Sequence, residues 1–183
     1  MKTYVTSDLH FGHANIMKFC PVTRAPFRND VTRMNEEMIH MWNEIVNPYD
    51  LVYILGDFAF LNAEKAVATA CRLHGRKILI EGNHDQKLLK DESFRSCFES
   101  IHQYLSVNYG GHKIVMFHYP ISEWDQMHRG SLHFHGHLHG NKSGLESFRA
   151  KDVAFDATGQ IVLLMEDAIS DAIKGAIKGH HVD

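Results

Sequence analysis

Cysteine is scarce in this sequence, since the chain of 183 residues has only Cys20, Cys71 and Cys97. The three are widely spaced, no two form a Cys-x-x-Cys pair, and an odd number cannot all pair within one chain. A disulfide framework and a cysteine-based structural zinc site are therefore not expected. We expect instead a protein of a reducing compartment, the cytoplasm.

Long hydrophobic runs and an excess of positive charge are also absent. No apolar run approaches the roughly 18 residues that a membrane-spanning helix requires, and the start, MKTYVTSDLH, lacks the apolar core of a secretory leader. The formal net charge is -3. We therefore predict no membrane association and infer no protein partner, and nucleic acid is not the default partner, although a nucleic-acid end stays open as a substrate.

Short apolar runs that end in polar residues recur along the chain. We predict strands at residues 3–10, 50–58, 77–85, 113–120 and 132–139. Strands that alternate with helices indicate an α/β architecture, and 44% hydrophobic residues suffice for one core. Because no linker or repeat interrupts the pattern, we expect a single domain over residues 1–183.

Helical spacing appears between these runs. The stretch VTRMNEEMIHMWNEIV has an apolar stripe that predicts core packing, and NAEKAVATACRLHG predicts a helix with Asn62 as N-cap and Gly75 as its stop. The stretch VAFDATGQIVLLME predicts strand, turn and strand, followed by a helix that carries Ile169, Ile173 and Ile177 on one face. We predict no catalytic residue after residue 150, and a terminal tail at His180 and His181.

Polar side chains with lone pairs follow the predicted strands, where each one ends. In open α/β sheets, ligands bind beyond the carboxyl ends of the strands. In HFHGHLHG, residues 133–140, alternate histidines share one face of an extended chain, and Gly136 admits a close approach to the backbone. The side chains in question are Asp8, His10, Asp57, Asn83, His84, His118, His137 and His139.

Carboxylate, imidazole and amide oxygen without thiolate suit a divalent ion such as Mn²⁺, Fe²⁺, Zn²⁺ or Ni²⁺. The set is larger than one tetrahedral ion needs. Two ions about 3.5–4 Å apart, bridged by a carboxylate, would use it fully, and such pairs serve hydrolases of phosphate esters. The residues by themselves therefore predict metal-assisted hydrolysis.

The order of the motifs DLH, GD, GNHD, H and GHLH over residues 7–139 resembles the five signature blocks of the calcineurin-like metallophosphoesterases. The strings TSDLHFGHANI and HLHG are similar to the small, single-domain bacterial and phage-type members. The resemblance implies an α/β fold with a central β-sandwich flanked by helices and a metal site at the carboxyl ends of the strands. It also implies two metal ions, for which we expect Mn²⁺ first.

The resemblance also implies a role for each motif residue. Asp57 would bridge the two ions, and His84 would be the catalytic histidine that faces the leaving oxygen. A hydroxide between the ions would attack phosphorus in line. The first metal would be held by Asp8, His10 and His139, and the second by Asn83, His118 and His137.

The sequence departs from the Ser/Thr protein phosphatase branch after the GD block. That branch has an Asp and an Arg there, whereas this chain has Phe60 and Leu61. His84 therefore lacks the orienting carboxylate of that branch, and the phosphate-gripping arginine is missing. The departure is an argument against a phosphoprotein phosphatase.

Three residues are candidates for substrate contacts: His13, Arg24 (or Arg28 as its alternative) and Trp124. Each has a plain structural alternative. His13 also suits a polar helix start, loop arginines are mostly solvated, and Trp124 suits a lid over the core better than a platform for a base. His133 and His135 are expected to line or support the pocket rather than bind metal.

Three functions stay open on the sequence. The leading one is a dinuclear metal-dependent phosphodiesterase of a small nucleotide-like or cyclic phosphate ester, because a short chain without insertions leaves an open, shallow site. The second is a nucleotide phosphomonoesterase or pyrophosphatase. The third is a non-catalytic, metal-stabilised binding scaffold, which fits less well because every expected ligand and His84 are present.

Overall fold

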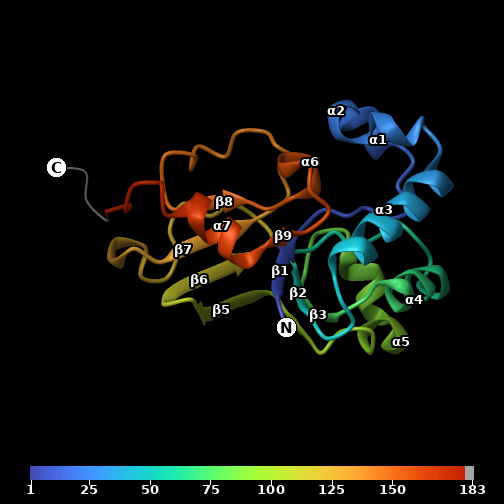
Figure 1. The fold of residues 1–183 in the computed structure, drawn as a ribbon, viewed down its shortest axis with the longest axis horizontal. Coiled ribbons are helices and arrows are strands. Elements are labelled where there is room, and N and C mark those ends of the chain that lie inside the picture. Colours follow the sequence, from blue (N-terminus) through green and yellow to red (C-terminus); the bar gives the residue numbers. More distant parts are fainter. Residues whose placement is uncertain (180–183) are drawn as a thin grey trace.

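Two β-sheets pack face to face in the computed structural model, which describes residues 1–179 (Figure 1). The expected tail at His180 and His181 lies outside the described residues. In the first sheet four strands are parallel and β9 is antiparallel to β1. The order is β4 (Ser100–His102), β3 (Arg76–Ile80), β2 (Leu51–Ile54), β1 (Thr3–Thr6) and β9 (Leu163–Leu164).

The second sheet contains a hairpin and a parallel part. The strands β5 and β6 are antiparallel and turn at Gly110 and Gly111, both with positive φ, while β6, β7 and β8 are parallel. The strands β4, β5 and β8 are not predicted by the sequence patterns. The order is β5 (Tyr104–Tyr109), β6 (His112–Phe117), β7 (Leu132–His135) and β8 (Ala150–Asp152).

The predicted strands are confirmed in shorter form, because each strand ends before the loop that carries its polar residues. The two main helices are confirmed as well: α3 begins after the Asp30 cap, and the Asn62 side chain accepts a hydrogen bond from the Lys65 N–H at the start of α4. The helices are α1 (Ile16–Phe19), α2 (Pro21–Arg24), α3 (Val31–Ile45), α4 (Ala63–Arg72), α5 (Glu92–Arg95), α6 (Phe155–Thr158) and α7 (Met165–Ala172). Short 3-10 turns are η1 (Ala25–Phe27), η2 (Asp85–Lys90) and η3 (Met127–Arg129).

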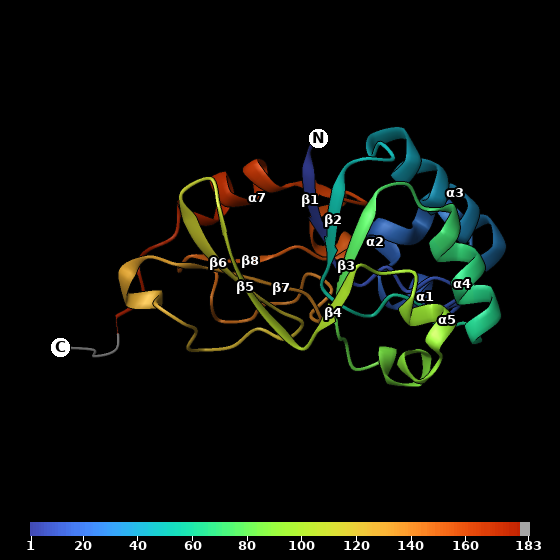
Figure 2. The same cartoon turned by 90° about the horizontal axis from the view of Figure 1, so that it is seen from below.

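Alternating side chains of the first sheet enter two hydrophobic cores. Tyr4 packs with Met38 and Trp42 of α3 on one face, and Val5 packs with Phe134 of the second sheet on the other. Figure 2 shows α3, α4 and α5 beside the first sheet, and α7 at the opposite part of the molecule. The predicted α/β sandwich flanked by helices is therefore confirmed. Among the described residues, no helix has the length and apolar character to cross a membrane.

The structure corrects three expectations on helix ends and turns. The helix α4 ends at Arg72, ahead of Gly75. The stretch after residue 153 forms α6 rather than a strand, because the left-handed Gly159 donates its N–H to Phe155 O and closes a helical turn.

The last helix, α7, also ends earlier than predicted, at Ala172. Of its predicted apolar face, Ile169 is buried, whereas Ile173 and Ile177 are exposed. The chain leaves the helix because the Ala176 N–H donates to Ser147 O at 2.8 Å and draws residues 173–177 toward the second sheet.

Candidate metal centre

The loops that follow the strands of both sheets meet beyond the carboxyl ends of the strands. The His10 N–H donates to Asp57 O at 3.0 Å, which joins the loops after β1 and β2. The His137 N–H donates to Asp8 Oδ2 at 2.8 Å, which joins the loop after β7 to the loop after β1. Polar side chains from both sheets are thereby brought to one edge.

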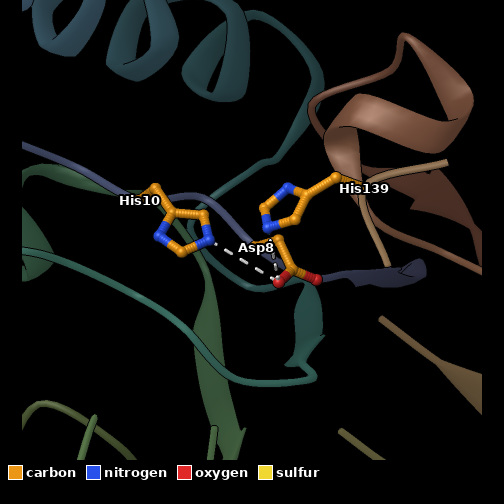
Figure 3. Close-up of side chains that lie close together, drawn as sticks. All are labelled: Asp8, His10 and His139. Carbon is orange, nitrogen blue, oxygen red and sulfur yellow. Dashed lines mark ion pairs between the residues drawn. The ribbon is translucent and has the colours of Figure 1, made fainter. Parts of the chain in front are cut away.

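Asp8, His10 and His139 form a first group of side chains that point toward one another (Figure 3). His10 Nε2 lies 3.6 Å and His139 Nε2 lies 3.7 Å from Asp8 Oδ1. One ligand atom from each residue lies within 4.8 Å of the others. The three atoms are therefore close enough to share one cation.

Asp8, Asp57 and His118 form a second group of the same kind. His118 Nε2 lies 3.7 Å from Asp57 Oδ2. The same Asp57 oxygen lies 3.7 Å from His10 Nε2, which belongs to the first group. The Asp57 carboxylate therefore stands between the two groups.

Asn83 and His137, the other two residues predicted to hold the second metal, lie at the edge of this group. Asn83 Oδ1 is 2.9 Å from His118 Nε2. The His137 ring packs across His118 and Tyr119, with ring centroids 5.1 and 4.6 Å apart, and falls outside both groups of ligand atoms. Burial, together with the nearby His118, lowers the pKa of His137.

Unpaired buried polar atoms show that these residues suit a metal ion. Asp8 Oδ1 and both ring nitrogens of His10 are buried without a hydrogen-bond partner. Leaving such a group unpaired costs about 1–3 kcal/mol, and more when it is charged. Burial alone would raise the pKa of Asp8, but the neighbouring imidazoles of His10 and His118 lower it to about 2. A buried carboxylate beside imidazoles with free lone pairs fits a divalent cation.

The backbone at five of the predicted ligands lies in the left-handed region, which residues other than glycine adopt rarely. Backbone strain of this kind costs about 1–3 kcal/mol per residue and concentrates at functional sites. The φ angles are 56° at Asp8, 51° at His10, 55° at Asp57, 72° at His137 and 50° at His139.

Two glycines allow the loops to approach one another. A Cβ at Gly136 would overlap Ser7 Oγ and Asp8 Oδ2, and a Cβ at Gly82 would overlap Asp57. Both positions need glycine for close approach to a predicted ligand, and not merely for a turn.

A comparison with known families decides the class of the protein. The model of the calcineurin-like phosphoesterase superfamily domain matches residues 1–163. The chain belongs to this superfamily. Membership indicates a phosphoesterase, a hydrolase of a metal-dependent family, and it confirms the resemblance carried by the five motifs.

Relatives and a solved structure agree with the assignment. The phosphoesterase is 37% identical over 142 residues to the uncharacterized protein MJ1445 of Methanocaldococcus jannaschii, covering 76% of this chain and 70% of the relative. It is 26% identical over 200 residues to the Gene 66 protein of Mycobacterium phage L5, covering 93% of each. The structure of protein AQ665 from Aquifex aeolicus superimposes with a TM-score of 0.70 at 23% identity, covering 91% of this chain and 96% of that one, and supports the fold.

The predicted catalytic residue of the phosphoesterase, His84, lies beside the two groups without belonging to either. Its side chain is 44% exposed, and Nε2 lies 3.9 Å from Asp57 Oδ2. Its backbone N–H donates to Asp57 Oδ1 at 2.9 Å. The Phe60 ring packs against it, with ring centroids 4.4 Å apart, so the imidazole lies between an aromatic ring and the Asp57 carboxylate.

The structure corrects the expectation that Arg24 contacts substrate. Arg24 is fully buried, donates to both carboxylate oxygens of Asp156 at 2.7 and 2.9 Å, and donates to the carbonyls of Asp8 and Leu9. The guanidinium of Arg24 therefore stabilises, from inside the protein, the loop after β1 that carries Asp8. Arg28, the alternative, is exposed.

Asp156 is a site residue that no sequence pattern predicted. Its Oδ2 lies 2.9 Å from His139 Nδ1, on the ring edge opposite to the Nε2 that faces Asp8. A carboxylate in this position fixes the tautomer and the orientation of a metal-binding imidazole. Although burial opposes it, bonding to His139 and Arg24 lowers the pKa of Asp156, so the carboxylate stays charged.

Asp156→Asn is expected to weaken binding at the first metal position about 10- to 100-fold, because the amide cannot reproduce the charge that orients His139. Calorimetric titration of the chelated protein with Mn²⁺ measures the effect, and Asp167→Asn, at an exposed acid on α7, is the control. Equal affinity in the two variants would contradict the orienting role.

Asp85, the last residue of GNHD, is a second residue whose role was missed. Its buried carboxylate accepts hydrogen bonds from three backbone N–H groups, those of Asp57, Phe58 and Gly82, each at 2.9 Å. These bonds hold the loop after β2 against the loop after β3. Burial raises the pKa of Asp85, and the three donors oppose the shift.

Asp85→Ala is expected to lower the free energy of unfolding by about 3 kcal/mol or more, because three buried N–H groups lose their acceptor. Urea unfolding gives the value. Asp91→Ala serves as a comparison, since Asp91 accepts from one N–H at the start of α5 and its loss costs about 1 kcal/mol. A loss no larger than that of Asp91→Ala would contradict this account of Asp85.

Four candidates remain, namely His13, Trp124, His133 and His135. His13 lies near the site, with its ring 5.4 Å from His10. The structure corrects Trp124: it is 5% exposed, donates to Ser131 O and stacks on His133, so no base can reach it. His133 and His135 are buried on β7, and His133 bonds the strand next to it through Val115 O.

Proposed function

We propose that this phosphoesterase is a dinuclear metal-dependent phosphodiesterase that hydrolyses a small nucleotide-like or cyclic phosphate ester. The observation that carries the proposal is the position of Asp57 Oδ2, which lies 3.7 Å from Nε2 of both His10 and His118. One carboxylate within reach of both groups is what a pair of bridged ions requires.

Some residues of the site would bind the metal ions, and others would act on the ester. Two divalent ions, Mn²⁺ in the first instance and Fe²⁺, Zn²⁺ or Ni²⁺ as alternatives, would supply Lewis acidity and make water nucleophilic near neutral pH when bound. Asp8 and Asp57 provide the negative charge of the site. The first position would be held by Asp8, His10, His139 and Asp57, and the second by Asp57, Asn83, His118 and His137.

His84 is the proposed proton donor to the leaving oxygen. Its half-exposed ring stands at the edge of the two groups, and its N–H bond to Asp57 Oδ1 fixes its backbone beside the centre. An imidazole in this position protonates the departing oxygen or stabilises charge that develops on it.

The charge of the surroundings favours a diester over a monoester. A cleft that opens on the centre has no lysine or arginine among the residues that line it, and the nearby Arg24 is buried and bound to Asp156. A diester carries one negative charge, whereas a monoester near neutral pH carries up to two and needs more compensation. A nucleotide-like ester or a nucleic-acid end therefore fits better than a phosphoprotein.

The test compares bis-p-nitrophenyl phosphate with p-nitrophenyl phosphate, using chelated protein reconstituted with Mn²⁺. We expect Mn²⁺-dependent turnover of the diester. Turnover of the monoester alone would replace the proposal by a phosphomonoesterase. Turnover of neither substrate, with two ions bound, would support a binding scaffold instead.

A further inference from the structure

A cleft of about 420 Å³ opens on the candidate metal centre. This volume lies within the range of small-molecule binding sites. The cleft begins at two predicted metal ligands and His84 and continues toward α1. Its lining includes His10, His139, His84, Phe60, His13 and Phe19.

Three of these side chains form an aromatic wall: His13, Phe19 and Phe60. The rings of His13 and Phe60 are nearly parallel, with an interplanar angle of 11° and centroids 4.0 Å apart. The ring centroid of Phe19 lies 6.3 Å from that of His13. Phe60 also packs against His84, with ring centroids 4.4 Å apart. Aromatic rings thus lead from the proposed proton donor to the outer end of the cleft.

Two of the three rings of the wall are exposed to solvent. Phe19 is 71% exposed and Phe60 is 40% exposed, and both line the cleft. Apolar surface at a rim of polar residues marks a binding site more often than a solvated face. Because Ile16, Cys20 and Asn141 complete the lining and no Lys, Arg, Asp or Glu contributes to it, the cleft suits a flat group without formal charge.

We propose that the aromatic wall binds the nucleobase of a nucleoside ester whose phosphate lies at the metal centre. The proposal rests on the proposed phosphoesterase function. Because His84 lines the same cleft, the nucleoside in it is attached through the oxygen that His84 faces, which makes it the leaving group. Stacking is tolerant of base identity, since every base offers a flat face.

The test measures binding, so it does not depend on turnover. Adenosine 5′-monophosphate and ribose 5-phosphate are titrated into Mn²⁺-loaded protein by calorimetry. We expect the nucleotide to bind about 5- to 150-fold more tightly, which is the contribution of one stacked base. Ribose 5-phosphate carries the same phosphate and sugar, so the ratio of the two dissociation constants isolates the base.

Variants then assign the preference to the wall. Phe60→Leu removes the ring but keeps apolar bulk, and Phe19→Ala changes an exposed side chain. We expect the double variant to bind both ligands about equally. Tyr49→Ala removes an aromatic ring that is 81% exposed and does not line the cleft, and we expect it to keep the wild-type ratio.

Parallel assays of bis-p-nitrophenyl phosphate hydrolysis separate this proposal from the function on which it rests. Equal binding of the two ligands to wild-type protein, or a preference that survives in the double variant, overturns the nucleobase site even where hydrolysis is intact. Absence of binding by both ligands overturns it as well. The last outcome is a wild-type protein that does not hydrolyse the diester but prefers the nucleotide, with the preference lost in the double variant. That outcome supports the nucleobase site and overturns the phosphodiesterase function.

Discussion

Asp57→Asn is expected to reduce hydrolysis by about 1000-fold or more and to lower the occupancy of both metal ions. The Asp57 carboxylate is 2% exposed, and one oxygen lies 3.7 Å from a histidine of each group. Asparagine keeps the shape but loses the charge, and it has only one oxygen to offer. The two positions therefore lose a shared anionic ligand at once.

Metal content by plasma emission spectroscopy, together with diester hydrolysis, checks this expectation for Asp57. The matched control is Asp167→Asn, which removes an exposed carboxylate from α7 and should change neither quantity. Two bound ions and full activity in Asp57→Asn would show that this carboxylate does not bridge. Loss of one ion alone would assign Asp57 to a single position.

His84→Ala is expected to keep both metal ions and to lower the rate about 100- to 10,000-fold. The His84 ring belongs to neither group of ligand atoms, and alanine retains the backbone N–H that donates to Asp57 Oδ1, although it loses the 3.9 Å contact of Nε2 with Asp57 Oδ2. The substitution therefore removes the imidazole and keeps the 2.9 Å hydrogen bond that holds the Asp57 carboxylate. Metal content and kcat are the two measurements.

The choice of leaving group sharpens this test of His84. A proton donor matters more when the leaving alcohol is basic, so the loss should be larger for an alkyl ester than for a p-nitrophenyl ester. His40→Ala, at an exposed imidazole on α3, is the control and should leave the rate unchanged. A large fall in metal content would instead identify His84 as a metal ligand.

Strand and helix patterns predicted β1, β2 and β3 of the first sheet and its main helices, because buried parallel strands and amphipathic helices have strong local signals, but they did not predict the edge strand β4. The strand β5 escaped prediction. Its sequence YLSVNY alternates exposed and half-buried side chains, and it becomes a strand through its pairing with β6 across the turn at Gly110 and Gly111. The stretch that forms α6 was misassigned because its β-branched neighbours outweighed the effect of Gly159.

The candidate ligands were predicted from spacing, because each follows a strand directly. The residues that support them were not. Arg24 and Asp156 lie 132 positions apart, and nothing in the local sequence of either indicates a buried ion pair that reaches His139. Asp85 belongs to the GNHD motif, but its role was not predicted because its three backbone hydrogen-bond donors come from two different loops.

The sequence by itself determined the alternation of strands and helices, the chemistry of the metal-binding side chains and the family, because these depend on residue type and on spacing along the chain. Only the tertiary structure decided which atoms meet. The position of Asp57 between two groups, the burial of Arg24 and the aromatic wall of His13, Phe19 and Phe60 arise from contacts between distant loops. Such contacts depend on how the two sheets pack, which local sequence does not encode.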